Sequence, residues 1–412
     1  MSGCDSQDFD IVIAGGGMVG ASLAAALATL PLRTLVVEAT RPSDAAQPSY
    51  DDRATAISES SRRILEGIGC WSALADHAAP MRMIHVSERG AFGATRLAAR
   101  DQGLASFGHV VENRALGAAL WERMRSAPGV TAWSPARVVG LAQEEERVRV
   151  SVARGNAAPL EVRARLLVAA DGARSPAREM AGIGHEVREY GQVAVIANVT
   201  PAMDHAGTAF ERFTPSGPLA VLPLTRGRVT VVWTQSPEQA EATMALDDAG
   251  FLAGLQAAFG YRLGALRKAG RRACYSLSLV QAQAWHAGRV VLAGNAAHGI
   301  HPVAGQGFNL GLRDVAALAE LIARQGAAGD PGAAALREEY AEWREADCAR
   351  TIRDTNGLVQ LFASEFAPLR VGRRLGLVGL DLFPSARAVL ARRGMGLAGR
   401  LPRLALGQPL SP

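Results

Sequence analysis

The sequence predicts an α/β protein (α+β overall), in which a Rossmann-like nucleotide-binding domain is interrupted by a β-sheet domain and followed by a C-terminal helical segment. Three observations support this prediction: a strand–glycine–helix unit at the chain start, a second glycine-rich bend near residue 294, and alternating apolar residues between them. At 412 residues the chain exceeds one ordinary core, so two closely packed domains are expected.

The chain start has the pattern of a dinucleotide-binding unit. An apolar strand, 9–14, runs into a turn that contains Gly15, Gly17 and Gly20, and an alanine-rich helix, 21–30, follows. The first glycine permits the tight turn, the second lets the backbone approach a pyrophosphate, and the third lets helix and strand pack closely. The next strand, 34–37, ends at Glu38, whose carboxylate can accept hydrogen bonds from both ribose hydroxyls of an adenosine. A ligand-free turn would leave Glu38 unexplained, so we expect a dinucleotide here.

The second glycine-rich bend lies between an apolar strand, 290–293, and a helix that begins near Gly307. A helix N-terminus carries roughly half a positive charge, so it can hold a phosphate or a ring that becomes negative during a reaction. The run at this point is more elaborate than a simple phosphate loop and consists of Gly305, Gln306, Gly307, Phe308 and Asn309. We therefore expect it to hold the reactive ring of a cofactor.

The middle of the chain has period-two patterning that is typical of a sheet. The expected strands are 192–199, 208–213, 218–224, 228–234 and 274–279, with one helix at 247–259. We expect a discontinuous nucleotide-binding domain, residues 1–182 and 273–356, a substrate-binding sheet domain, 183–272, and a C-terminal helical segment, 357–412. No second glycine-rich βαβ unit occurs in the sequence, which argues against a separate nicotinamide-binding domain.

Composition excludes several function classes. Lys268 is the single lysine and lies in no motif that would make it catalytic, and the scattered cysteines lack metal-ligand spacing, so we expect no metal site. The net charge is +5, but aromatic residues make up only 5%, and no basic platform with interleaved aromatics occurs, so nucleic-acid binding is not expected. The acidic start and the lack of an apolar run of ~20 residues predict a cytoplasmic protein without a signal peptide or membrane span.

The C-terminal segment concentrates positive charge. Arginines outnumber the single acid, Asp381, between residues 370 and 403, and apolar residues lie among them. This pattern predicts one or two amphipathic helices broken at Pro384. They could lie on an anionic membrane face, dock onto partner subunits, or simply pack over the nucleotide-binding domain.

A third motif, Val168 to Arg178 with Asp171-Gly172 at its centre, completes a resemblance to the flavoprotein aromatic hydroxylases, the para-hydroxybenzoate hydroxylase-like group. More specific segments resemble the ubiquinone-biosynthesis branch, and within it the 2-polyprenyl-6-methoxyphenol hydroxylases. These segments are 85–90, 193–198, 210–215, 217–224 and 367–372. The resemblance runs from Asp10 to about Arg393.

The resemblance implies a flavoprotein monooxygenase that uses FAD, transient NAD(P)H and O₂. It would hydroxylate a polyprenyl methoxyphenol para to the phenol hydroxyl, through a flavin C4a-hydroperoxide, in ubiquinone biosynthesis. It also implies that Arg53, Arg114 and Asp171 serve FAD and that Pro302 lies beside the flavin ring. Asn295 stands where the wider group has an aspartate, and an asparagine carbonyl can still accept a bond from the ribityl chain.

The chemistry requires a dry site and an electron-rich phenol. Apolar residues of the sheet domain should wall the ring (Leu219, Val221, Leu222 and Pro223), and the candidate substrate contacts are Phe213, Leu222 and Pro223. His301, beside Pro302, is the candidate group that activates the phenol, although a backbone carbonyl or a water could act instead. His298 is expected to make a structural hydrogen bond.

Three alternatives remain open at this point. A related hydroxylase could act at another carbon of the same ring. A flavin-dependent prenyl reductase would reduce isoprenoid double bonds without consuming oxygen. A flavin-free scaffold of a quinone-biosynthesis complex would lack the yellow flavin spectrum.

Overall fold

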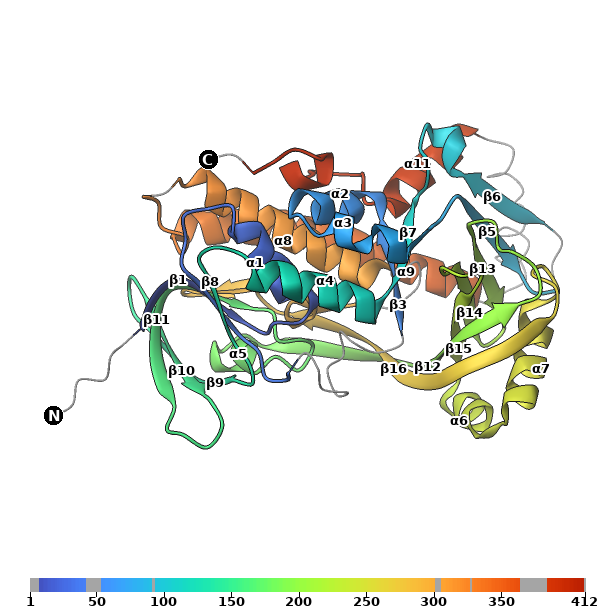
Figure 1. The fold of residues 1–412 in the computed structure, drawn as a ribbon, viewed down its shortest axis with the longest axis horizontal. Helices are drawn as coiled ribbons and strands as arrows, with labels where there is room; N and C mark the ends of the chain where they lie inside the picture. Colours follow the sequence, from blue (N-terminus) through green and yellow to red (C-terminus); the bar gives the residue numbers. More distant parts are fainter. Residues whose placement is uncertain are drawn as a thin grey trace.

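The computed structural model describes residues 7–41, 53–90, 93–300, 305–326, 328–363 and 384–410. Over these residues the chain forms two large sheets, one small sheet and a layer of helices, and it confirms the predicted α/β class (Figure 1). Within this part of the chain, no helix is long and apolar enough to cross a membrane.

The first sheet has a parallel core of the order β18-β11-β1-β2-β8. Its members are β1 (Gln7–Ala14), β2 (Thr34–Val37), β8 (Val130–Trp133), β9 (Arg137–Gln143), β10 (Val148–Ala153), β11 (Leu160–Ala169), β17 (His286–Ala287) and β18 (Val290–Leu292). The central strands are apolar on both faces because helices or strands cover both sides. Parallel strands end at one edge, so the loops that follow β1, β2, β11 and β18 meet there.

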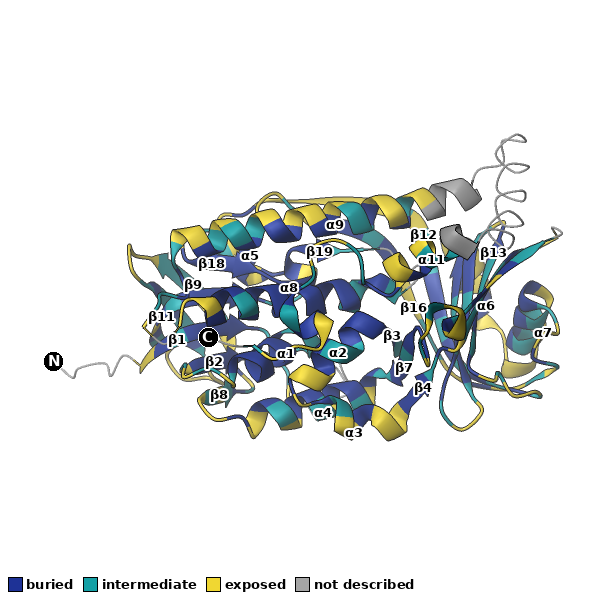
Figure 2. Cartoon of the chain, turned by 90° about the horizontal axis from the view of Figure 1, so that it is seen from above, coloured by how far each residue is buried: buried dark blue, intermediate teal, exposed yellow. Residues whose placement is uncertain are grey.

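Helices cover one face of this sheet: α1 (Met18–Leu27), α4 (Asn113–Arg125), α8 (Gln306–Arg324) and α9 (Ala334–Ala363). Figure 2 shows α8 as a largely buried helix beneath the more exposed α9. A Cβ at Gly311 would lie 2.9 Å from the Val19 side chain, so the small residue lets α8 approach α1 closely. The helix expected at 21–30 begins at Met18, because Gly17 acts as its N-cap, and it ends at Leu27.

The second sheet has the order β19-β16-β12-β15-β14-β13-β5-β6. Its members are β5 (Met83–Glu88), β6 (Ala94–Ala98), β12 (His185–Pro201), β13 (Thr208–Thr214), β14 (Gly217–Pro223), β15 (Val229–Gln235), β16 (Leu266–Ala282) and β19 (His298–Gly299). Two helices, α6 (Pro237–Ala245) and α7 (Asp248–Phe259), cover its outer face (Figure 1). The long strands β12 and β16 connect this sheet to the region of the first.

A small third sheet, β3 (Ala54–Ser58), β7 (Gly108–Glu112) and β4 (Ala78–Pro80), packs against the inner face of the second sheet. The Arg228 guanidinium forms two 3.1 Å hydrogen bonds with the Glu112 carboxylate, which ties β7 to the turn between β14 and β15. Shorter helices complete the fold: α2 (Glu59–Gly67), α3 (Trp71–Leu74) and α5 (Pro176–Met180).

Sheet membership differs from the sequence prediction in two places, one of which is β19, within residues 273–356, which pairs with β16 in the second sheet. The β5–β6 hairpin lies within residues 1–182, yet β5 pairs with β13 and so extends the second sheet. Local patterning identifies a strand but carries no signal for a partner more than 100 residues away. The strand expected at 274–279 is the end of the longer β16, and α6 was not expected.

The described part of the C-terminal segment packs onto the rest of the chain. Helix α11 (Pro384–Gly394) buries Ala391 against Leu97 and Phe107, and Leu404 enters the main core. Helix α11 begins at Pro384, as the sequence predicts for a helix boundary; residues 364–383, where the other predicted helix falls, lie outside the described residues.

Candidate active site

The turn after β1 requires its glycines. Gly15 has a φ of +97°, and a Cβ there would lie 2.5 Å from the Ala170 carbonyl oxygen, at the start of the Asp-Gly motif. A Cβ at Gly20 would lie 1.9 Å from the Gly15 carbonyl oxygen. Gly17 forms the N-cap of α1, which has no side-chain cap and no acidic residue in its first turn. The first N–H groups of α1 therefore suit an anionic group such as a pyrophosphate.

Glu38 lies at the end of β2, as the sequence predicts, and is 8% exposed. Its carboxylate accepts hydrogen bonds from the Gly16 N–H (2.6 Å) and the Thr40 N–H (2.8 Å). A carboxylate offers about four lone-pair positions and can therefore take part in several hydrogen bonds at once. Glu38 thus fixes the glycine turn against the second strand, and its contact with a ribose stays a prediction.

The Asp-Gly motif is anchored to the second glycine-rich bend. The Asp171 carboxylate accepts hydrogen bonds from the Ser175 hydroxyl and the Ala177 N–H, which fixes the start of α5. Burial raises the pKa of Asp171 above its usual range. Arg178 is fully buried and donates to the Ala296 carbonyl oxygen (2.9 Å). The motif thereby holds the loop that follows β18.

A buried carboxylate on α8 also anchors the loop that follows β18. Asp314 of α8 accepts hydrogen bonds from the Gly294 N–H (2.9 Å), His298 Nε2 (2.7 Å) and Arg344 Nε (2.7 Å). His298 makes the structural hydrogen bond that was expected. Asn295 is exposed at the loop, whereas His301 and Pro302 lie outside the described residues, so their roles stay predictions.

Gly305 and the first turn of α8, Gln306 to Asn309, form a second place that suits an anionic group, called the cradle below. Gly305 is the N-cap of α8 with a φ of +61°, and the helix has neither a side-chain cap nor an acid in its first turn. A Cβ at Gly305 would lie 2.9 Å from the Ala56 side chain, whereas a Cβ at Gly307 would meet nothing within 4 Å. Asn309 is buried and donates to the Ala56 carbonyl oxygen (2.8 Å). Asn309 therefore positions the cradle against β3, and its direct contact with a cofactor stays a prediction.

Other predicted residues of this cradle have defined surroundings. Gln306 is mostly buried and its amide lies 3.4 Å from the Gly394 carbonyl oxygen of α11. The Phe308 side chain is partly buried against the main core. The C-terminal helix thus contacts the first turn of α8.

Arg53 and Arg114 lie together near this edge. The Arg53 carbonyl oxygen accepts a 2.8 Å hydrogen bond from the Asn113 N–H, so the start of β3 adjoins the start of α4. The Arg53 guanidinium lies 4.6 Å from the ring centroid of Tyr275 on β16, and Arg114 is exposed. The contacts of Arg53 and Arg114 with FAD stay predictions.

Only some of the residues predicted to surround the substrate lie on the face of the second sheet that adjoins the cradle. Leu222 packs against the cluster that contains Ala56, on the inner face. Leu219 and Val221 instead pack with the helices of the outer face, so the prediction that they wall the ring is wrong. Alternation places Pro223 with them and Phe213 on the inner face. Residues 218–224 are apolar throughout, so their pattern did not reveal which side chain faces which way.

Comparison with known proteins identifies the class. Residues 8–354 match the FAD binding domain family. The chain belongs to this family. It is similar to the ubiquinone hydroxylase UbiL of Rhodospirillum rubrum, with 39% identity over 100% of this chain and 95% of the relative. It is also similar to the 3-demethoxyubiquinol 3-hydroxylase of Escherichia coli, with 32% identity over 91% of this chain and 95% of the relative.

The fold is shared with solved flavoproteins. The crystal structure of p-nitrophenol 4-monooxygenase from Pseudomonas putida matches with a TM-score of 0.79 and 20% identity, over 96% of this chain and 99% of that one. The protein is an FAD-dependent monooxygenase, an oxidoreductase for which NAD(P)H and O₂ are the usual co-substrates.

The residues present fit FAD. The turn at Gly15 and Gly20 leaves no room for side chains, which is the geometry that a pyrophosphate needs to approach backbone. The open side of Gly307, on an uncapped helix, suits an electron-rich ring edge.

The buried ion-pair network of Asp314, Arg344 and Asp347 was not predicted from the sequence. Asp314 and Arg344 are fully buried, and Arg344 Nη1 also bonds to the Asp347 carboxylate (2.8 Å). A sequence signal existed, because Arg313-Asp314 interrupts an otherwise apolar helix, but their partners on α9 are 30 or more positions away.

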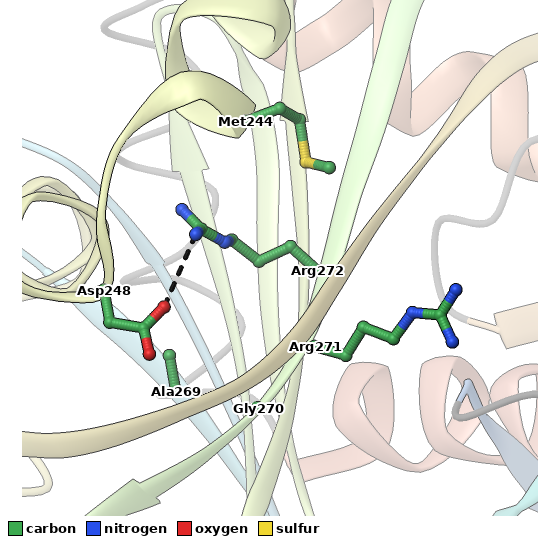
Figure 3. Close-up of a pocket in the computed structure, with 6 residues that line it drawn as sticks. All are labelled: Met244, Asp248, Ala269, Gly270, Arg271 and Arg272. Atoms are coloured by element: carbon green, nitrogen blue, oxygen red, sulfur yellow. Dashed lines mark hydrogen bonds and ion pairs between the residues drawn. The ribbon is translucent and has the colours of Figure 1, made fainter.

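An open cavity of about 440 Å³ lies on the outer face of the second sheet, between α6, α7 and β16 (Figure 3). Arg272 borders it, donates to the Leu246 carbonyl oxygen (2.6 Å) and pairs with Asp248 (3.4 Å). Arg271 points the other way in Figure 3. The cavity is on the face opposite the cradle, so it takes no part in the candidate active site.

Proposed function

We propose that this protein hydroxylates a polyprenyl methoxyphenol of ubiquinone biosynthesis, para to the phenol hydroxyl. The observation that carries the proposal is the full-length similarity, at 39% identity, to a protein named as a ubiquinone hydroxylase. The apolar cluster on the inner face of the second sheet, next to the N-terminus of α8, suits an aromatic ring with an isoprenoid tail.

Bound FAD, reduced by NAD(P)H, would supply the activation of O₂. The protein would do the rest. The N-terminus of α8 would stabilise negative charge on the pyrimidine end of the reduced ring. The Asp314 network would hold the bend at Gly294, and Ala56, Ala209 and Leu222 would exclude water from the space beside it.

A second candidate is hydroxylation at another carbon of the same ring. The Escherichia coli relative is named as a 3-hydroxylase, which supports this alternative. The two reactions use the same flavin parts, so ring position depends on how the phenol is oriented on the inner face. A prenyl reductase is the third alternative, and it would consume no oxygen.

The test is turnover by the purified flavoprotein with NAD(P)H, O₂ and a short-chain 2-prenyl-6-methoxyphenol, followed by mass spectrometry and NMR of the product. Addition of one oxygen para to the hydroxyl supports the proposal. Addition at another carbon selects the second candidate, and a saturated prenyl chain selects the reductase. Peroxide alone would refute the substrate assignment while leaving the FAD assignment intact.

We also propose that the protein works at the inner membrane face or in a quinone-biosynthesis complex, since such a phenol partitions into lipid. Val389 and Leu390 of α11 are exposed beside Arg392 and Arg393, which is consistent with a surface contact there. Co-sedimentation with anionic vesicles, compared with neutral vesicles, tests the membrane option.

A further inference from the structure

The strand β13 presents one acidic side chain to the inner face of the second sheet. On the outer face, the ring of Phe210 lies 5.3 Å from that of Phe259 on α7, and Arg212 Nε donates to the Ala258 carbonyl oxygen (3.0 Å). Successive side chains of a strand point to opposite faces. Glu211, between these two residues, therefore points to the inner face.

The inner face at this point adjoins the cradle. Ala209, two residues before Glu211 on the same face, packs in one cluster with Ala56, Val110 and Leu224. Ala56 is the residue that lies 2.9 Å from the Cβ that Gly305 would carry. The side of β13 that bears Glu211 thus continues the wall beside the N-terminus of α8.

The surroundings of Glu211 are apolar. Its neighbours on the adjacent strands are Ala220 of β14 and Val86 of β5. Within the described residues, Glu211 Oε1 is shielded from solvent and has no hydrogen-bond partner. Burial raises the pKa of Glu211 to about 7. A ligand bound beside Ala209 and Ala220 could supply the hydrogen-bond donor that this shielded oxygen lacks.

A second polar group lies on the same face. Thr230 of β15 stands opposite Leu222 in the register, is fully buried, and its hydroxyl has no partner among the described residues. Buried polar groups without partners are uncommon in folded proteins. Thr230 lies on the same face as Glu211 but two strands away, with β14 between them, so the two groups line the wall at separate points.

We infer that Glu211 is the group that binds and activates the phenol, with Thr230 as an additional hydrogen-bonding group for the substrate. This inference rests on the proposed function. In the step, the phenol O–H bond breaks, its proton passes to the Glu211 carboxylate, and the electron pair stays on the phenolate oxygen. No electron is transferred in this step. The phenolate is more electron-rich at the para carbon, where oxygen is added.

Other charged side chains also lie on this face. They are Glu88 of β5, Arg228, which is paired with Glu112, and Arg271 of β16. Only desolvation shifts the pKa of Glu211, so these charges leave it governed by burial. His301, the sequence-predicted activator, is the competing assignment.

The experiment compares the wild-type holoenzyme with Glu211→Gln, Glu211→Asp and the control Glu241→Gln, which changes an exposed glutamate on α6. Flavin content, product formation and the pH profile are measured with a short-chain 2-prenyl-6-methoxyphenol. Binding of this phenol and of its O-methyl ether is measured from the change in the flavin spectrum. The ether lacks the proton that Glu211 would accept.

We expect Glu211→Gln to retain FAD, to lose hydroxylation by about 10²-fold or more, and to lose the wild-type rise in rate near pH 7. The wild type should prefer the phenol to its ether, and the variant should not. Glu211→Asp should keep a pH-dependent rate, and Glu241→Gln should match the wild type.

Wild-type hydroxylation by Glu211→Gln, with its pH profile intact, would overturn the inference and favour His301. Loss of flavin from both Glu211 variants would also overturn it, because it would assign Glu211 to the fold. If the wild type itself forms no oxygenated product, the proposed substrate fails instead. The preference for a phenol over its ether then still decides the role of Glu211.

Discussion

Replacement of Asp314 by alanine should destabilise the protein far more than loss of a surface carboxylate. Asp314 accepts bonds from Gly294, His298 and Arg344, and both Asp314 and Arg344 are fully buried. Removal of one partner of a buried ion pair costs about 3–5 kcal/mol. Asp347 still bonds to Arg344, so we expect the lower half of this range, to which the unsatisfied Gly294 N–H adds on the order of 1 kcal/mol.

The matched control is Glu339→Ala. Glu339 also accepts bonds from two arginines, Arg324 and Arg400, but all three side chains are partly exposed, so its loss should cost about 1 kcal/mol or less. Urea unfolding of the apoprotein and the holoprotein, followed by circular dichroism, measures both variants. Flavin content should fall only in Asp314→Ala, since the bend at Gly294 loses its anchor. Equal destabilisation by the two variants would refute this role for the buried network.

The contribution of Asp314 to stability should also depend on pH. Burial acts to raise the pKa of Asp314, but His298, Arg344 and the Gly294 N–H outweigh it and hold this pKa below the ordinary value of 3.8. A depressed carboxyl pKa adds stability that is complete above the unfolded value and is lost as the pH falls through the folded value. The difference in stability between wild type and Asp314→Asn should therefore be constant near neutral pH and shrink below about pH 4.

Three further predictions concern the cradle, Glu211 and the thiols. Gly307→Ala should leave the apoprotein as stable as the wild type but weaken FAD binding, since its Cβ meets no protein atom within 4 Å, whereas Gly20→Ala should disrupt the fold itself; calorimetry with flavin titration separates the two, and unchanged FAD affinity in Gly307→Ala would contradict the cradle. Glu211→Gln should gain stability relative to the wild type as the pH rises from 4.5 to 7, by about 1–3 kcal/mol, because a raised carboxyl pKa makes ionisation costly in the folded state; a pH-independent difference in chemical denaturation would contradict this. Cys274 should react readily with a thiol reagent, while Cys70 and Cys348 should react only on unfolding, because burial raises the pKa of each thiol to about 12; labelling without denaturant, with the labelled cysteines located by peptide mass mapping, checks this, and fast labelling of either buried thiol would count against it.

Sequence reasoning worked best where a local steric rule applies. The turn at Gly15 and Gly20 was predicted because close contacts restrict those positions, and Glu38 was predicted from its place at the end of the second strand. The bend at Gly305 was predicted from its glycines between a strand and a helix.

Long-range contacts were beyond the reach of local patterns. The pairing of β5 with β13 joins segments more than 100 residues apart, and the bond between Asp314 and Arg344 joins two helices. Where both faces of a strand are buried, as in β14, hydropathy cannot assign the face of a side chain. Glu211 had a usable signal, because it is an acidic residue in a strand that also carries the buried Phe210 and Phe213. The face to which it points became clear only from the packing of Phe210 on α7.

The most direct test of the central claim is the fate of molecular oxygen. The purified holoenzyme is incubated with NAD(P)H, ¹⁸O₂ and a short-chain 2-prenyl-6-methoxyphenol, and the product is analysed by mass spectrometry and NMR. We predict one ¹⁸O atom in the product, on the carbon para to the phenol hydroxyl, with one NAD(P)H consumed per product. Oxidation of NAD(P)H that yields only ¹⁸O-labelled peroxide, with the phenol recovered unchanged, would contradict the account.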